Sequence, residues 1–160
     1  MSGYVLPRSI LSGHFVMLGF TDMMAAGETC PALTTAPGAE GWVALKQREG
    51  RYVVAAGAPT RAALEGKGEV MVRGWATCDE PTPASTDIPP APAAPGRITM
   101  HLGVDRFHAD QDEATAIEKA MRDRTGAEAR VAAILSVAAD GRPRTKGLVV
   151  DGKRVELTWF

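Results

Sequence analysis

The sequence predicts a mainly β fold, α+β at most: an antiparallel, partly closed barrel or a two-sheet sandwich of about eight strands, with one covering helix at about residues 111–125. Three observations predict it. Apolar and polar residues alternate through several short segments, the pattern of a half-buried strand. Gly-containing turns join these segments, and strands joined by tight turns run antiparallel. One stretch combines helical spacing with capping residues at both ends.

Several segments have the composition of strands. The first, Ile10–Phe20, is an apolar run interrupted by His14 and two glycines, and it is predicted as a strand or core segment. In Lys153–Trp159 every second residue is apolar from Val155 onward, so one face of the strand is apolar. The remaining candidates are Trp42–Gln47, Arg51–Ala55, Glu69–Arg73, Arg97–Leu102, Arg130–Ala138 and Pro143–Val150.

Three turn sequences connect these strands. Glu49-Gly50 lies between the candidate strands Trp42–Gln47 and Arg51–Ala55. Asp140-Gly141 and Asp151-Gly152 each lie between two candidate strands near the C-terminus. Asp-Gly between apolar runs is a strong signal of a tight hairpin, because both residues accept a positive φ. The strands on either side of each turn are therefore expected to pair antiparallel.

One helix is predicted, from about Gln111 to Thr125. Asp110 can cap its N-terminus, Glu113 follows three residues later in a box-like arrangement, and Gly126 ends it. Its apolar stripe is narrow, so the helix is expected to lie across a sheet or a barrel mouth.

The chain of 160 residues is predicted to form a single domain over residues 1–160. Asp79–Gly96 holds six of the eleven prolines, and proline removes the N–H groups that a central strand needs. This stretch is predicted to be a solvated, partly polyproline loop inside the domain.

Composition excludes several classes of function. The net charge is −1 and the basic residues are scattered, so no nucleic-acid partner is expected. His14, His101 and His108 have no spacing that brings them together, and acidic residues near a helix start are ordinary, so no metal or cofactor is predicted. Cys30 and Cys78 have neither redox nor zinc spacing, and they are either two free thiols or one disulfide.

Ser9 and Lys46 form the one nucleophile pair that the sequence offers. A Ser before a Gly-led turn with a Lys on a later strand is similar to the Ser/Lys dyad of signal peptidases and self-cleaving repressors. There a desolvated Lys takes the Ser proton. Polar residues follow Lys46, so a turn Ser and a surface Lys are the commoner interpretation.

Four segments also follow a known order: Pro7–Phe20, Gly41–Trp75, Leu102–Phe107 and Val131–Gly152. In this order they resemble the GDYXLXLR family of uncharacterised bacterial membrane-anchored proteins. The Gly-Asp-Tyr of that family stands here as Gly13-His14-Phe15, and its final Leu-Arg as Gly19-Phe20. The matching positions, interpreted as structural, are Gly13, His14, Phe15, Leu18, Phe20, Gly103, Asp105, Arg106 and Phe107.

The resemblance implies a domain on the periplasmic face of the inner membrane, whose anchor is missing from this chain. A strand reaching Phe20 needs a partner that Met1–Leu6 is too short to supply, so a first strand and an apolar segment of about 20 residues are expected upstream. Without such an anchor the protein is expected in the cytoplasm.

The function predicted from the sequence is that of a non-enzymatic, extracytoplasmic interaction or scaffold domain. Its expected partner is a membrane protein, or a second copy bound through an exposed strand edge. No small molecule can be assigned. The alternatives are a Ser/Lys-type hydrolase and a small-ligand-binding barrel.

Overall fold

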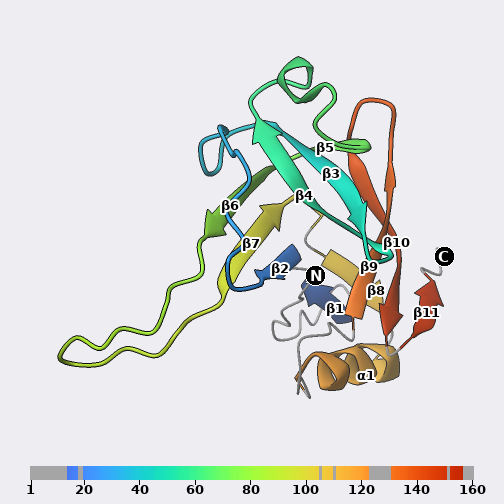
Figure 1. Ribbon diagram of the computed structural model, residues 1–160. Helices are drawn as coiled ribbons and strands as arrows, with labels where there is room; N and C mark the ends of the chain where they lie inside the picture. Colours follow the sequence, from blue (N-terminus) through green and yellow to red (C-terminus); the bar gives the residue numbers. More distant parts are fainter. Residues whose placement is uncertain are drawn as a thin grey trace. The chain divides into compact units, whose positions relative to one another are not determined.

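The computed structural model describes residues 14–17, 20–104, 106–109, 111–122, 131–150 and 152–156. This part of the chain contains eleven strands, one short 3₁₀ helix and one α-helix (Figure 1). The mainly β class with antiparallel pairing and one helix is confirmed. The strands outnumber the expected eight, and none of the described sheets closes into a barrel, because each runs between two edge strands.

The contacts of the chain group it into two compact units. One is Thr21–His101, and the other combines Met1–Phe20 with Leu102–Phe160. Each unit has its own sheets and its own buried side chains. The single domain expected over residues 1–160 stays a prediction.

The first sheet of the unit Thr21–His101 has the order β4-β3-β5, with β3 at Trp42–Arg48, β4 at Arg51–Ala58 and β5 at Val70–Arg73. The predicted Glu49-Gly50 turn joins β3 to β4, and its φ values are 51° and 77°. Two positive φ values give the turn the twist that the flanking strands need. The antiparallel pairing expected here is confirmed.

One face of this sheet carries the 3₁₀ helix η1, Ala62–Leu64. Leu64 is 2% exposed and packs in a cluster with small side chains of β3 and β4, namely Ala44, Ala56 and Ala58. Small residues on the strands leave room for the larger leucine, which is how close packing is reached. The central strand β3 is buried from Val43 through Leu45.

The second sheet of this unit has the order β2-β7-β6, with β2 at Phe20–Met24, β6 at Trp75–Asp79 and β7 at Gly96–His101. In β7 the buried residues alternate with more exposed ones, as the sequence predicts for Arg97–Leu102. The strand β6 was not predicted, because its sequence Trp-Ala-Thr-Cys-Asp has no clear alternation.

The segment Ile10–Phe20, predicted as a strand or core segment, is described only at residues 14–17 and 20. Within the described residues it contributes β1, His14–Met17, and only the first residue of β2. β1 pairs with β8, Arg106–Ala109, so this chain itself supplies a strand partner that was expected upstream.

The unit that combines Met1–Phe20 with Leu102–Phe160 holds a further sheet, of order β9-β10-β11. Its strands are β9 at Val131–Val137, β10 at Pro143–Val150 and β11 at Lys153–Glu156. Both pairs are antiparallel, as the Asp-Gly turns predict. Leu148 of β10 is fully buried.

The helix α1 spans Gln111–Arg122, so the predicted start is confirmed, and residues 123–126 and the capping residue Asp110 lie outside the described part. The helix contacts β1 and β9 and buries Ala114 and Ile117. It therefore covers a sheet, as expected from its narrow apolar stripe. Within the described residues, no helix has the length and apolar character needed to cross a bilayer.

Candidate interaction site

An extended arm projects from the unit Thr21–His101 between β6 and β7 (Figure 1). The β6–β7 ladder ends at the pair Asp79 and Arg97, and the chain continues outward from there. Residues 80–95, called the Pro-rich arm below, are exposed except for Pro81 and Ser85, which are half-buried. The solvent exposure expected for Asp79–Gly96 is thus present over residues 80–95, whereas Gly96 is buried as the first residue of β7. The segment is also more ordered than a loop.

Backbone hydrogen bonds hold the two sides of the arm together. Thr82 and Ala94 each donate an N–H to the other's carbonyl oxygen, at 2.9 and 3.0 Å, and Ser85 and Ala91 do the same at 2.9 and 3.3 Å. These pairs continue the register of β6 and β7 without a shift. The two sides of the arm therefore stay aligned as far as its tip.

Prolines limit what the arm can offer to a neighbouring strand. The hydrogen-bonded residues recur at every third position on each side, which is the period of a polyproline II helix. Strand addition needs backbone donors along an edge, and proline has none. The six prolines around these pairs are Pro81, Pro83, Pro89, Pro90, Pro92 and Pro95. The arm is therefore poorly suited to extending a sheet of another protein.

Residues 86–90 form the tip of the arm. The hydroxyl of Ser85 accepts the N–H of Asp87 at 3.1 Å and donates to its carboxylate at 2.9 Å. Ile88 follows and is 99% exposed. Pro89 and Pro90 come next and fix two further φ angles. The tip thus presents a large apolar side chain on a backbone whose freedom is already reduced.

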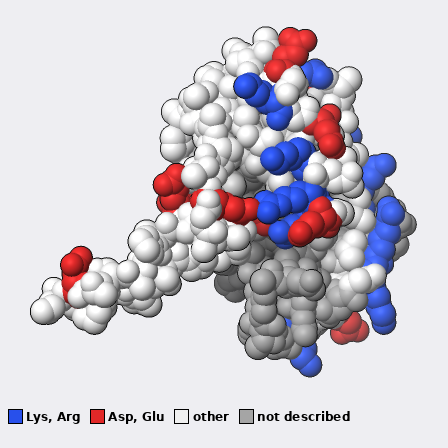
Figure 2. All heavy atoms as spheres, viewed as in Figure 1, with Lys and Arg blue, Asp and Glu red and all other residues white. Residues whose placement is uncertain are grey.

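All charged residues of the arm are acidic. Glu80 and Asp87 are its only charged residues, and it contains no Lys or Arg. In Figure 2 the arm extends away with an acidic group near its end, and the rest of its visible surface is uncharged. Any partner that complements this charge must therefore supply a cation beside an apolar surface.

Gly96 allows the two sides of the arm to approach each other closely at its root, where the arm joins β6 and β7. A Cβ atom at this position would lie 2.5 Å from Pro81 Cδ and 2.9 Å from the Asp79 carbonyl oxygen. Neither atom belongs to a flexible side-chain end. The return strand can therefore enter β7 beside Pro81 only because residue 96 has no side chain.

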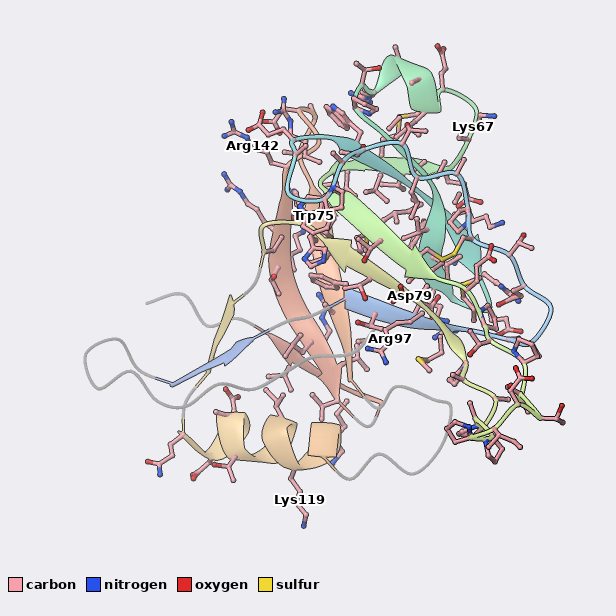
Figure 3. The ribbon with its side chains drawn as sticks, turned by 90° about the vertical axis from the view of Figure 1, so that its left-hand side faces the viewer. Lys67, Trp75, Asp79, Arg97, Lys119 and Arg142 are labelled. Atoms are coloured by element: carbon pink, nitrogen blue, oxygen red, sulfur yellow. A yellow bond between two sulfur atoms is a disulfide. The ribbon has the colours of Figure 1, made fainter. Side chains whose placement is uncertain are left out.

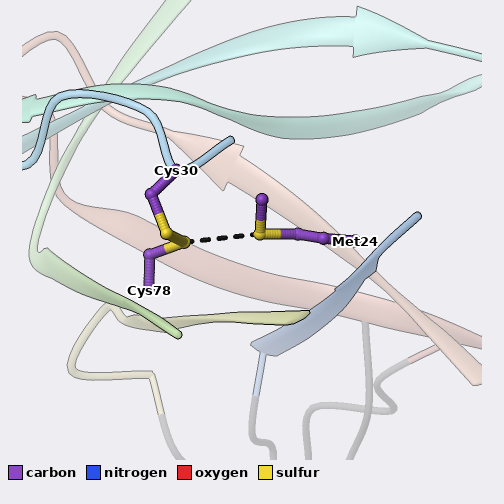
Figure 4. The surroundings of a disulfide bond; sticks show 3 residues. All are labelled: Met24, Cys30 and Cys78. Atoms are coloured by element: carbon purple, nitrogen blue, oxygen red, sulfur yellow. Dashed lines mark hydrogen bonds between the residues drawn. A yellow bond between two sulfur atoms is a disulfide. The ribbon is translucent and has the colours of Figure 1, made fainter. Parts of the chain in front are cut away.

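Cys30 and Cys78 are joined in a disulfide next to this root (Figure 4). Cys78 lies in β6, one residue before Asp79, and Cys30 lies in the loop after β2. Met24 Sδ lies 3.4 Å from Cys78 Sγ. A disulfide sulfur carries no hydrogen, so this is a packing contact between polarizable sulfur atoms. The disulfide ties the loop after β2 to the strand that leads into the arm.

A second set of contacts orders the same loop. The Glu28 carboxylate accepts the Ala25 N–H at 2.8 Å and pairs with Arg48 at 2.6 Å. These two partners, the Ala25 N–H first, lower the pKa of Glu28 below its ordinary value of 4.5. Asp22 and Arg51 form a further ion pair at 3.3 Å. Both arginines come from the ends of β3 and β4, so the hairpin holds β2 and its loop.

Two aromatic clusters lie elsewhere in this unit. The Trp42 ring has the guanidinium carbons of Arg61 and Arg73 at 5.5 and 5.2 Å from its centre, within cation–π range. Trp75, at the end of β6 opposite Asp79 (Figure 3), stacks on His101 of β7 at 3.8 Å. His101 is therefore an aromatic partner across the strand pair, at the end of the ladder remote from the arm.

The predicted Ser/Lys pair is only half described. Ser9 lies outside the described residues, and Lys46 is exposed on β3. A lysine that acts as a general base must be desolvated, so the exposed Lys46 does not favour the hydrolase alternative. The small-ligand barrel has no described closed sheet to form its mouth.

The family-motif positions fall on paired strands where they are described. His14 and Phe15 lie on β1, and Arg106 and Phe107 lie on β8, which pairs with it. Phe20 is 3% exposed at the start of β2, and Gly103 has a φ of 69°. The structure thus brings the first and third resembling segments side by side. The positions outside the described residues are Gly13, Leu18 and Asp105.

Among the described residues, no three His, Cys, Asp or Glu side chains are grouped so that they could hold a metal ion. Asp112 and Glu113 lie in the first turn of α1, where acidic residues favour the helix dipole. Asp105 and Asp110 lie outside the described part.

Sequence reasoning did not identify Ile88 as a candidate. A signal was present, because Ile88 is the only large aliphatic residue between Glu80 and Pro95. The clustering of Trp42 with Arg61 and Arg73 had no such signal, since these residues are far apart in the chain.

Comparison with known proteins adds one match. A family model described as GDYXXLXY protein matches residues 5–148, which confirms the family resemblance inferred from the sequence. The spacing of that pattern coincides with residues 13–20, where Gly13 and Leu18 are kept and His14, Phe15 and Phe20 replace its Asp and two Tyr. Leu18 thus stands at the leucine of the pattern, and Phe20 at its last tyrosine rather than at an arginine. No curated protein and no solved structure matches the chain.

Proposed function

The chain belongs to the GDYXXLXY family, and from this membership and the Pro-rich arm we propose that it is a non-enzymatic interaction domain of a membrane-anchored protein, outside the cytoplasm. The arm forms the contact with the partner, and the strand units form the scaffold that holds it.

The Pro-rich arm is the observation that carries this proposal. Ordering a residue costs about 1–2 kcal/mol of backbone entropy, and this cost is normally recovered by burial. The arm is almost fully exposed and is held by few backbone hydrogen bonds, so it adds little to the core of its unit. Prolines reduce the entropy that is lost, and they keep the arm extended. An extended, exposed segment of this kind serves contact with another molecule better than it serves stability.

The disulfide supports the proposed location outside the cytoplasm. Structural disulfides persist in oxidising compartments and are rare in the cytosol. Cys30 and Cys78 are both half-buried, and their bond fixes the root of the arm. A protein whose binding element depends on a disulfide functions best in the periplasm.

One experiment tests the interaction. In an arm-short variant, residues 83–93 are replaced by Asn-Gly, which closes the Thr82–Ala94 pair with a two-residue turn. In cells of the native host, cross-linking of the wild-type protein is expected to give a discrete species of higher mass that the arm-short variant does not give. A Tyr52→Ser variant, which changes an exposed residue of β4, serves as the control and keeps that species. An unchanged cross-linked species in a folded arm-short variant contradicts the proposal.

A second experiment tests the compartment. Cells are quenched in acid, and free thiols are labelled before and after reduction. We expect Cys30 and Cys78 to react only after reduction, and we expect the protein to fractionate with the membrane. Labelling of both thiols without reduction, together with a wholly soluble protein, contradicts the extracytoplasmic assignment.

A further inference from the structure

We infer that the tip of the Pro-rich arm docks into a protein partner through an apolar pocket with a cationic rim, with Ile88 as the anchor and Asp87 as the partner of the cation. This inference rests on the proposed interaction function and names the residues and the chemistry of the contact.

Ile88 has the properties of an anchor residue. It is 99% exposed, whereas the other exposed large apolar side chains of the described residues, Met23 and Tyr52, are 48% and 40% exposed. Almost its whole side chain is therefore available for burial by a partner. Full burial of an isoleucine strengthens binding by about tenfold to a hundredfold.

The tip is ordered before it binds. Ser85 holds Asp87 through two hydrogen bonds, and two prolines follow Ile88. The aligned ladder behind the tip limits its swing relative to β6 and β7. A contact element that is already ordered loses less entropy on binding, so a small tip gives useful affinity.

Charge favours a protein pocket over a membrane surface. The arm carries Glu80 and Asp87 and no basic residue, so an anionic bilayer repels it. A single isoleucine also buries far less apolar surface than one acyl chain, and one acyl chain gives only marginal membrane binding. A pocket can surround Ile88 on all sides, and a Lys or Arg at its rim can pair with Asp87.

Strand addition is the other mode available to an extended segment, and the prolines of the arm oppose it. The contact therefore depends on the side chains of the tip. A contact made by side chains is lost on a single substitution at the tip, whereas a contact made by the backbone is not. Single substitutions at the tip therefore distinguish the two modes.

The test uses the full chain in cells of the native host, with a photo-reactive amino acid at Thr86, beside the tip. We expect one discrete adduct with a different protein. Ile88→Ser should lower its yield about tenfold or more, Ile88→Leu should keep it, and Asp87→Lys should lower it because the cationic rim then repels the tip. Tyr52→Ser is the matched control at another exposed apolar site and should change nothing.

Three results overturn the inference. The first is an adduct whose yield is unchanged by Ile88→Ser. The second is an adduct whose mass is that of two copies of this chain. The third is Ile88-dependent flotation of the purified protein with vesicles of phosphatidylethanolamine and phosphatidylglycerol.

Failure of the inference and failure of the proposed function can be told apart. If the arm-short variant loses its cross-linked species while Ile88→Ser keeps the adduct, the arm makes the contact through other residues and only the inference fails. If the arm-short variant keeps the species, both fail.

Discussion

Cys30 and Cys78 lie 48 residues apart in the sequence, yet the structure places their Cα atoms 5.9 Å apart and bonds their sulfur atoms. The link joins the loop after β2 to β6 at the root of the Pro-rich arm. It therefore connects a segment near the beginning of the unit Thr21–His101 to the strand that carries its candidate binding element.

Loss of this disulfide should destabilise the protein strongly. In the chain-entropy model, closing a loop of this length stabilises the folded state by about 4 kcal/mol. We expect the Cys30→Ala/Cys78→Ala variant to unfold at a lower urea concentration, as measured by circular dichroism. Reduced wild-type protein is the control and should match the variant. A decrease in the free energy of unfolding of less than about 1 kcal/mol would contradict a structural role for the disulfide.

Gly96→Ala should destabilise the root of the arm. The added Cβ would meet Pro81 Cδ at 2.5 Å and the Asp79 carbonyl at 2.9 Å, so backbone must move. Overpacking of this kind costs about 1–3 kcal/mol. Ala84→Ser, at an exposed position of the arm, is the matched control and should change the free energy of unfolding by less than about 0.5 kcal/mol. Equal free energies of unfolding for Gly96→Ala and Ala84→Ser would contradict the close approach of residue 96 to Pro81.

Glu28 should make stability depend on pH. Its folded-state pKa lies below 4.5, mainly because the Ala25 N–H donates to its carboxylate. A lowered pKa in the folded state means that this stabilisation is present above pH 4.5 and is lost as the pH falls through the folded-state pKa. The difference in urea midpoint between wild type and Glu28→Gln should therefore be present at neutral pH and vanish in acid.

A difference that is the same at neutral and acidic pH would show that the charge of Glu28 is not responsible. Arg48→Gln removes the second partner while the Ala25 N–H remains. It should reduce the pH dependence without abolishing it.

The Pro-rich arm should be the first site cut by a broad-specificity protease. Its backbone is exposed and few hydrogen bonds protect it. We expect the first cut within Asp79–Gly96, before any within α1, as read by mass spectrometry of the fragments. The arm-short variant is the control and should resist the protease for longer. An initial cut within Gln111–Arg122 would mean that the helix opens more readily than the arm.

The hairpins and the start of the helix could be predicted because their signals are local. Glu49-Gly50 closes β3 and β4 through two positive φ values, and the choice of those two residues decides the turn. The helix begins at Gln111, where acidic residues in its first turn favour the helix. In each case the interactions that decide the structure lie within a few residues of one another.

Other elements had no local signal. β6 lacks alternation, and it is a strand because β7 pairs with it after a long excursion of the chain. The segment Ile10–Phe20 is mostly apolar, so its sequence alone could not tell that β1 pairs with β8 while Phe20 belongs to β2. The proline content of Asp79–Gly96 predicted exposure, but proline content alone could not predict that Thr82 and Ala94 pair.

The sequence by itself determined the antiparallel β class, the turns, the helix that begins at Gln111 and the family, because each follows from residue types at short spacing or in a fixed order along the chain. Tertiary structure alone decided that β1 pairs with β8, that Cys30 meets Cys78, and that Ile88 stands exposed at the tip of an ordered arm. These features depend on contacts between residues far apart in the chain. Such contacts form only when the whole unit has lost its conformational freedom, so no short stretch of sequence specifies them.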